Sequence, residues 1–235
     1  MNAAQNAGRH NADLAASTSR IKRGGTYKRQ RVIMIVPAIA PIPPRVYLSH
    51  VSLIFPPNQA AHRHLAYGDE VGVAYSESIE AILAHPDLST WEYILTVETD
   101  NAPPSDGLIK LIAQMEAHPE LACIGGCYWT KGENGVCQIW GDPRDPVLNF
   151  RPQLPDPNGG LVECVGTGMG FNLWRLSMFK DNRLRKPWFK TMASREGVGT
   201  QDLYAWADFR KHGYRCAIDC SVLVGHYDAV SDVMW

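Results

Sequence analysis

The sequence lacks any hydrophobic run approaching the roughly 20 residues that cross a bilayer, and its N-terminus lacks the apolar core of a secretory signal. We therefore expect no membrane partner and a cytoplasmic location. Charged residues make up only 20% of the 235 residues, against 45% hydrophobic residues, which excludes disorder as the main state. This length suits one well-buried α/β domain and is short for two.

Short cysteine pairs placed in turns, as a structural zinc site requires, are also missing. The cysteines instead lie in apolar, strand-like segments, at Cys123, Cys127, Cys137, Cys164, Cys216 and Cys220. Because the chain carries no export signal, we expect free buried thiols, with structural zinc as the less favoured alternative.

Net charge is almost absent, at −1, but it is unevenly distributed. Residues 1–31 hold seven Lys or Arg and one Asp, a net charge of +6 that leaves −7 for the rest. The first 19 residues are rich in Asn, Ala, Gly and Ser, which predicts a disordered basic arm over residues 1–29, followed by one domain over residues 30–235. A solvated arm is the ordinary interpretation, and binding to a polyanion such as DNA is the alternative.

From residue 31 onwards, buried strands alternate with amphipathic helices, which predicts an α/β fold with a mostly parallel central sheet. The predicted strands cover residues 31–36, 91–97, 121–128 and 215–224. The predicted helices cover residues 76–85, capped by Ser76, residues 105–115, capped by Ser105, and residues 201–212, closed by Gly213, with at most a short helix in residues 45–55. Residues 129–165 carry short β-like pieces and predict a smaller β-rich portion.

Two carboxylates, Glu98 and Asp100, stand where the predicted strand 91–97 ends. Side chains two apart on a strand share a face, and such a pair suits Mg²⁺ or Mn²⁺, although a solvated acidic turn is the alternative. Asp202 opens a predicted helix and His226 follows the last buried strand. Each alone is ordinarily a helix cap or a structural histidine, but together they favour a metal and a general base at one sheet edge.

This order of motifs resembles the GT-A glycosyltransferases of the family-2-like branch, over about residues 31–228. The resemblance implies a Rossmann-like single domain whose β-rich portion faces the acceptor. It also implies that Glu98-Thr99-Asp100 stands for the acidic triplet that binds the metal and the donor diphosphate, and that His226 completes the coordination. Asp202, after Gln201, takes the place of the catalytic base.

The resemblance also implies residues for donor binding. Pro37 and Ala38 should lie near the nucleobase, and the Gly166-Thr167-Gly168 loop should flank donor and acceptor. Ser76 stands, with the preceding tyrosine, where the family has an Arg-Asn pair. This departure leaves the identity of the donor open. A second departure is Glu98, which stands in place of Asp and lengthens the reach to the metal.

The implied activity is a metal-dependent, inverting hexosyl transfer from a nucleotide sugar, such as UDP-glucose, to an acceptor hydroxyl. The acceptor is a hydroxymethylated base in DNA, as for some phage-type relatives, or a protein, or a soluble glycan. A nucleotidyltransferase is disfavoured because residues 37–44 contain no glycine for a phosphate loop. A non-enzymatic nucleic-acid-binding module is disfavoured by the acidic body and the cysteine spacing.

Overall fold

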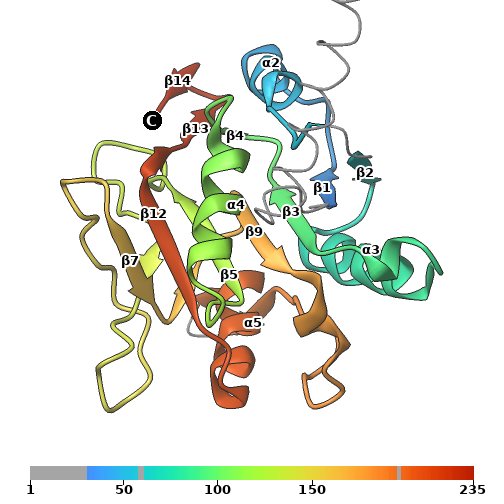
Figure 1. Cartoon of the computed structure of the whole chain (residues 1–235). Helices are drawn as coiled ribbons and strands as arrows, with labels where there is room; N and C mark the ends of the chain where they lie inside the picture. Colours follow the sequence, from blue (N-terminus) through green and yellow to red (C-terminus); the bar gives the residue numbers. More distant parts are fainter. Residues whose placement is uncertain (1–30, 58–60, 195–196) are drawn as a thin grey trace, which may run out of the picture. The chain divides into compact units, whose positions relative to one another are not determined.

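The computed structural model describes residues 31–57, 61–194 and 197–235, so the predicted arm over residues 1–29 lies outside the described part. A seven-stranded sheet forms the centre of the domain (Figure 1). Its strands, in spatial order, are β2 (Ala61–Tyr67), β1 (Val32–Ala38), β3 (Tyr93–Val97), β9 (Phe171–Arg175), β5 (Cys123–Cys127), β12 (Cys216–Leu223) and β7 (Leu161–Cys164).

Five of these seven strands run in the same direction, which confirms the prediction of a mostly parallel α/β sheet. β1 pairs in parallel with β2 and β3, and β5 pairs in parallel with β12. β9 is antiparallel to both of its neighbours, β3 and β5, and β7 is antiparallel to β12. The carboxyl ends of β1, β3, β5 and β12 therefore meet at one edge, where open α/β sheets bind their ligands.

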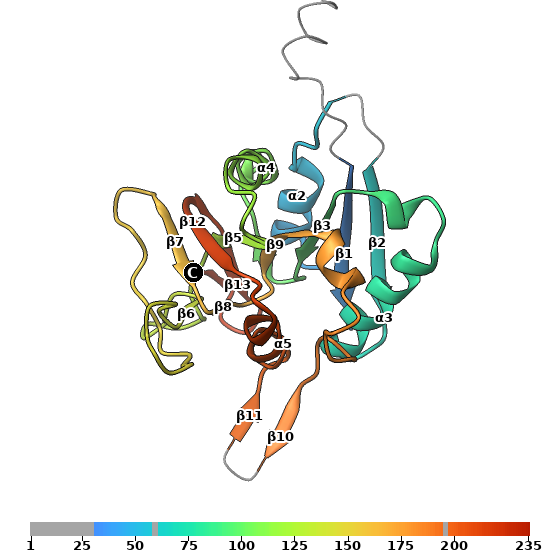
Figure 2. The ribbon, with the colours of Figure 1, turned by 60° about the horizontal axis from the view of Figure 1, so that its bottom comes forward.

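Helices cover both faces of the sheet (Figure 2). α2 (Pro44–Ser52) and α4 (Gly107–Ala117) lie on one face, and α3 (Val71–Ala84) and α5 (Gln201–Phe209) lie on the other. Alternate residues of β1 enter two different hydrophobic cores, since Ile33 packs with the α3 side and Met34 with the α4 side. A strand buried on both faces has no polar alternation, which explains its continuous apolar run.

Short elements complete the domain, and of these only β6 (Ile139–Trp140) lies within residues 129–165, where a β-rich portion was predicted. A three-stranded sheet joins β4 (Asn101–Ala102), β13 (Gly225–Asp228) and β14 (Val233–Met234). Two-stranded sheets join β6 (Ile139–Trp140) to β8 (Gly166–Thr167), and β10 (Met192–Ser194) to β11 (Gly197–Gly199), a hairpin that extends from the body in Figure 2. Three 3₁₀ helices are η1 (Leu88–Thr90), η2 (Leu176–Lys180) and η3 (Arg210–His212).

The helix ends differ from the prediction at two places. α3 begins at Val71, because the Glu70 carboxylate accepts hydrogen bonds from the first free backbone N–H groups, so the prediction that Ser76 caps this helix is wrong. α4 begins at Gly107, with Asp106 rather than Ser105 at the cap position. The C-terminal prediction is confirmed, because Gly213 adopts a left-handed φ of 86° after η3.

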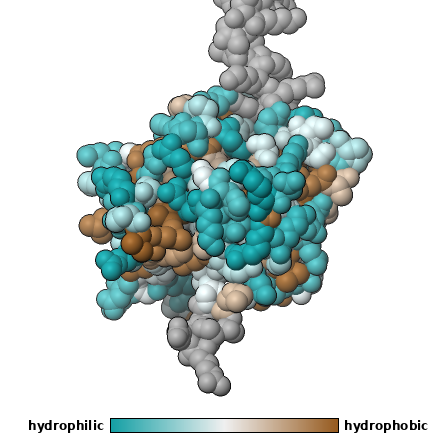
Figure 3. All heavy atoms as spheres, turned by 90° about the horizontal axis from the view of Figure 1, so that it is seen from below, coloured by the Kyte–Doolittle hydropathy of each residue, from teal (hydrophilic) through white to brown (hydrophobic). Residues whose placement is uncertain are grey.

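Apolar side chains are gathered mainly in the two cores. The face in Figure 3 is largely hydrophilic, and its hydrophobic side chains form separate groups. All six cysteines are buried and free, as predicted. None of the helices that the structure describes is long and apolar enough to cross a membrane.

Candidate active site

A cavity of about 360 Å³ lies where β1 and β3 end. Its walls come from the end of β1, the turn before α3 and the turn after β3. The lining residues are Pro37, Ala38, Ile39, Asp69, Glu70, Val71, Glu98, Thr99 and Asp100. The structure thus brings together five residues that the sequence singled out, at the sheet edge where a ligand is expected.

Strand register brings His226 to the acidic turn. β13 pairs antiparallel with β4, so that His226 is the partner of Asn101, and the backbone N–H of Tyr227 donates to the carbonyl of Asp100 at 2.7 Å. As a result, the His226 Nε2 atom lies 3.4 Å from Asp100 Oδ2. Two predicted metal ligands that are far apart in the sequence are therefore direct neighbours.

The environment of His226 fixes which ring nitrogen can bind a metal. Nδ1 lies 2.7 Å from the carbonyl oxygen of Trp129, and a carbonyl can only accept, so Nδ1 carries the hydrogen in this contact. In the neutral ring, Nε2 then presents its lone pair on the side of Asp100. A backbone carbonyl that orients a histidine in this way is typical of metal-ligating histidines.

Asp100 is held in its charged form by two neighbours, His226 and the Lys131 ammonium group. Burial alone would raise the pKa of Asp100, but the interactions with His226 and Lys131 outweigh burial and lower the pKa to about 2. The Lys131 ammonium group lies 2.6 Å from Asp100 Oδ2, the same oxygen that faces His226. Asp100 is consequently a carboxylate at any physiological pH.

Glu98 has the opposite tendency. Burial, followed by the negative charges of Asp100 and Asp202, raises the pKa of Glu98 from 4.5 to about 8, although Lys131 opposes the shift. Without an added cation, this side chain is therefore protonated at neutral pH. Two carboxylates with pKa values pushed apart in one cavity are a recognised mark of functional sites.

Asp202 lies in the first turn of α5 and is buried, with only 6% of its surface exposed. Its Oδ1 accepts a hydrogen bond from the backbone N–H of Leu203 at 2.8 Å. Burial raises the pKa of Asp202, and hydrogen bonds from Thr200 and Leu203 only partly oppose the shift. A raised pKa makes the carboxylate a stronger base, and its charge acts on Glu98 in the cavity.

The remaining predicted residues do not line this cavity. The Ser76 hydroxyl donates to the carbonyl of Phe189 at 3.2 Å and accepts from its N–H at 3.1 Å. Gly166, Thr167 and Gly168 are buried in and beside β8. A side chain at Gly166 would meet Trp206, and one at Gly168 would meet Tyr128 and Gln138, so these glycines allow close packing behind the site.

Sequence reasoning missed several residues of the site. Asp69 and Glu70 line the cavity directly before α3, and an acidic pair after a Gly at a helix start is the signal that could have identified them. Lys131 is a lone loop lysine that no sequence pattern marks. The structure also buries Tyr75 Oη and both polar side-chain atoms of Asn101 without a hydrogen-bond partner, which marks this region as unusually polar for a core.

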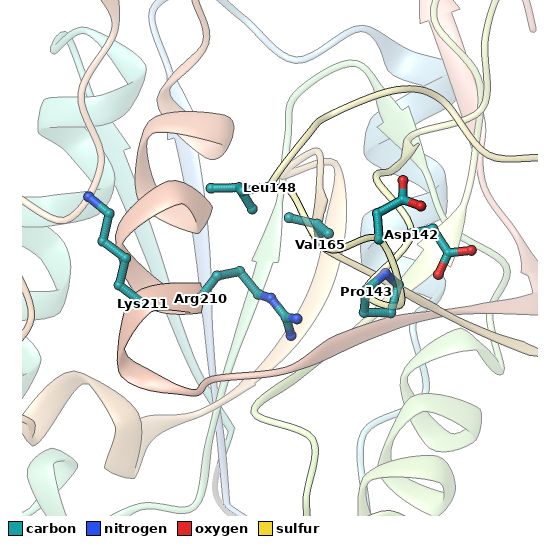
Figure 4. A pocket seen from close by; sticks show the side chains of 7 residues that line it. Asp142, Pro143, Leu148, Val165, Arg210 and Lys211 are labelled. Atoms are coloured by element: carbon teal, nitrogen blue, oxygen red, sulfur yellow. The ribbon is translucent and has the colours of Figure 1, made fainter.

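A second cavity, of about 260 Å³, contains none of the predicted residues. Figure 4 shows Arg210, on η3, pointing toward Pro143 and Asp142 on the opposite wall. η3 precedes β12, so this cavity lies at the amino end of that strand and away from the carboxyl-end edge. The Asp142 carboxylate is already paired with Arg144 at 2.6 Å, which leaves less charge for a ligand.

The site suits a metal that is shared with a ligand better than a metal held by protein alone. Among the described residues, no three His, Cys, Asp or Glu side chains form a ready-made metal cluster. Asp100 and His226 nevertheless bring an oxygen and a nitrogen of metal-binding chemistry next to each other, and Glu98 lines the same cavity as Asp100. Mg²⁺ in particular is usually bound by one or two carboxylates together with substrate phosphates.

Comparisons with known proteins bear on the fold. No protein-family model matches the sequence, and no curated protein is significantly similar to it. Among solved structures, A197 from STIV is similar over 84% of this chain and 86% of that chain, with a TM-score of 0.59 and 14% sequence identity. At this identity the similarity shows the fold alone, and the chain has a mixed α/β fold of the GT-A, Rossmann-like type.

Two further solved structures are less similar to this chain. TarS 1–349 from S. aureus gives a TM-score of 0.46 at 12% identity, covering 82% of this chain and 59% of that chain. A CMP:2-keto-3-deoxy-manno-octonic acid synthetase complexed with CTP gives 0.40 at 8% identity, covering 80% and 88%.

Proposed function

We propose that the protein is a metal-dependent, inverting glycosyltransferase that uses a nucleotide-sugar donor, with a UDP-sugar as the first candidate. The observation that carries the proposal is the Asp100–His226 pair, 3.4 Å apart at the carboxyl edge of the sheet, with the histidine tautomer fixed by Trp129. The fold supports the proposal, because open α/β sheets bind their ligands at this edge, and the order of sequence motifs supports it as well.

In this proposal the residues of the site have separate roles. Pro37 and Ala38 would contact the nucleobase, and Asp100, His226 and Glu98 would hold Mn²⁺ or Mg²⁺. When bound, the cation supplies positive charge that stabilises the leaving nucleoside diphosphate.

Asp202 is the proposed general base. Its buried carboxylate removes the proton from the acceptor hydroxyl, whose oxygen attacks the anomeric carbon while the diphosphate leaves. One base and one displacement invert the configuration at that carbon. The raised pKa of Asp202 supports this role, because a stronger base accepts the proton more readily.

For the acceptor, we propose a polyanion, with a hydroxymethylated base in DNA as the first candidate. The support is the net charge of +6 over residues 1–31, which suits phosphate contacts. A protein and a soluble glycan are the other acceptors to be tested.

The test is a donor screen with the purified full-length protein, Mn²⁺, and UDP-, GDP- and TDP-sugars, followed by mass spectrometry of the candidate acceptors. Release of a nucleoside diphosphate together with a hexose mass increment on an acceptor supports the proposal. Release of pyrophosphate from a nucleoside triphosphate and a sugar phosphate identifies a nucleotidyltransferase instead. No metal-dependent binding of any of these nucleotides contradicts both enzymatic assignments.

A further inference from the structure

The charge of the cavity poses a problem for a diphosphate ligand. Four acidic side chains line it, namely Asp69, Glu70, Glu98 and Asp100, and none of the described lining residues is Lys or Arg. A diphosphate brings further negative charge into a partly buried space, where repulsion is stronger than in water. A diphosphate therefore needs cationic groups from just outside this lining.

Lys131 is the cation that the structure holds at the edge of this cavity. Its Nζ atom lies 2.6 Å from Asp100 Oδ2, and its side chain keeps 34% of its surface exposed. His226 Nε2 faces the same oxygen at 3.4 Å. The ammonium group thus sits where a metal ion shared by Asp100 and His226 would compete with it for Oδ2.

The loop that carries Lys131 is anchored immediately beside it. The Thr130 N–H donates to the carbonyl of Val136, and the Val136 N–H donates to the Thr130 hydroxyl, both at 2.9 Å. Trp129, one residue earlier, accepts from His226. The backbone at Lys131 is therefore fixed, while its four-carbon side chain can turn, and lysine binds phosphate as a compact point charge.

We propose that Lys131 changes its ion-pair partner when the diphosphate binds. It neutralises Asp100 until a divalent cation binds there, and it then turns its ammonium group to a diphosphate oxygen. The inference rests on the proposed function, since it assumes that a metal and a diphosphate meet at Asp100. It assigns two opposite effects to one side chain. Lys131 weakens the binding of the metal alone and strengthens the binding of the diphosphate in the presence of metal.

The test uses calorimetry with two probes, Mn²⁺ alone and inorganic pyrophosphate at saturating Mn²⁺, on the full-length protein. Lys131→Met keeps most of the side-chain length and removes the charge. We expect its Mn²⁺ affinity to rise roughly fivefold and its pyrophosphate affinity to fall roughly fivefold, the upper scale of one partly exposed ion pair. Lys131→Arg keeps the charge and should keep pyrophosphate binding within about twofold of wild type.

Lys110→Met is the matched control, because Lys110 pairs with Asp106 at 3.0 Å on α4, outside the cavity. It should change neither affinity. Thermal unfolding confirms that each variant is folded, and Lys131→Gln replaces the Met variant if that variant is not.

The outcomes separate the two proposals. If wild type binds neither probe, the proposed function is contradicted. If wild type binds both, but removing the Lys131 charge shifts both affinities in the same direction or leaves either one unchanged, the inference about Lys131 alone is overturned. If Lys131 merely held Asp100 in place, replacing it would weaken the binding of both Mn²⁺ and pyrophosphate. Only opposite shifts of the two affinities therefore support the change of ion-pair partner.

Discussion

His226 is the antiparallel partner of Asn101, and this register places its Nε2 atom 3.4 Å from the carboxylate of Asp100. The contact joins β13, near the C-terminal end of the chain, to the turn after β3. Because β13 and β4 are only a few residues long, the site depends on a short ladder that is reinforced by the Tyr227 N–H bond to Asp100. Asp100 and His226 are thus positioned by backbone hydrogen bonds and not by side-chain contacts alone.

The shifted pKa of Glu98 predicts how stability depends on pH. A pKa raised from 4.5 to about 8 means that the folded state favours the neutral carboxyl, so this stabilisation is complete below pH 4.5 and is lost as the pH rises through 8. In metal-free protein, Glu98→Gln should reduce the fall in unfolding free energy between pH 5 and 9 by on the order of 2 kcal/mol. Urea denaturation at each pH measures this change.

Glu133→Gln, at an exposed loop carboxylate, is the control and should leave the pH profile as it is in wild type. The same protonation predicts that Mg²⁺ binds wild type more tightly at pH 8.5 than at pH 6.5, because a proton competes for Glu98. A Glu98→Gln profile that parallels wild type would show that Glu98 does not titrate in this range.

Asp202→Asn should lower turnover roughly 10²–10⁴-fold, the scale for losing a general base. Donor affinity should survive, because the base acts on the acceptor hydroxyl and the amide oxygen can still accept the Leu203 hydrogen bond. In the pH–rate profile of wild type, the apparent pKa of the acid limb should lie above 3.8, because burial raises the pKa of Asp202 above that ordinary value. Turnover and donor calorimetry on the same preparation separate the two effects.

Asp208→Asn controls for loss of a buried carboxylate on the same helix, where Asp208 accepts from the Arg185 N–H at 2.9 Å. It should affect stability and leave the chemical step intact. Near-normal turnover of Asp202→Asn would remove Asp202 as the base, and loss of both turnover and donor binding would indicate a structural role.

Deleting residues 1–29 should weaken binding to DNA if DNA is the acceptor. The deletion removes most of the Lys and Arg residues of the basic N-terminal segment, so fewer counterions are released on binding. The slope of log affinity against log salt should become shallower by about 1 to 4 units. Fluorescence anisotropy at several salt concentrations measures it, and an unaltered affinity and slope would exclude this role.

The central fold was predictable because helices cover both faces of the sheet. β1 and β3 are continuous apolar runs, which single out buried parallel strands. β2 was missed for the converse reason. It lies at the sheet edge, pairs only with β1 among the described strands, and alternates exposed and half-buried residues in a segment that contains two histidines and an arginine.

The sequence predicted that the acidic turn and His226 meet at one edge of the sheet, and it did not predict what surrounds them. Glu98 and Asp100 follow a recognisable buried strand, and His226 follows another, so their order and chemistry single them out. Lys131 reaches Asp100 only through the fold, since loop geometry and strand register bring them together. Ser76 shows the same limit, because its partner, Phe189, belongs to a distant segment that packs on α3.

The most direct test of the account is the Mn²⁺-dependent binding of UDP to wild type and to Asp100→Ala, measured by calorimetry with and without Mn²⁺. The account predicts that Mn²⁺ strengthens UDP binding to wild type and has no such effect on the variant, whose thermal unfolding remains cooperative. Equal Mn²⁺-dependent affinity in both proteins would contradict the assignment of Asp100 as a metal ligand and with it the proposed catalytic site.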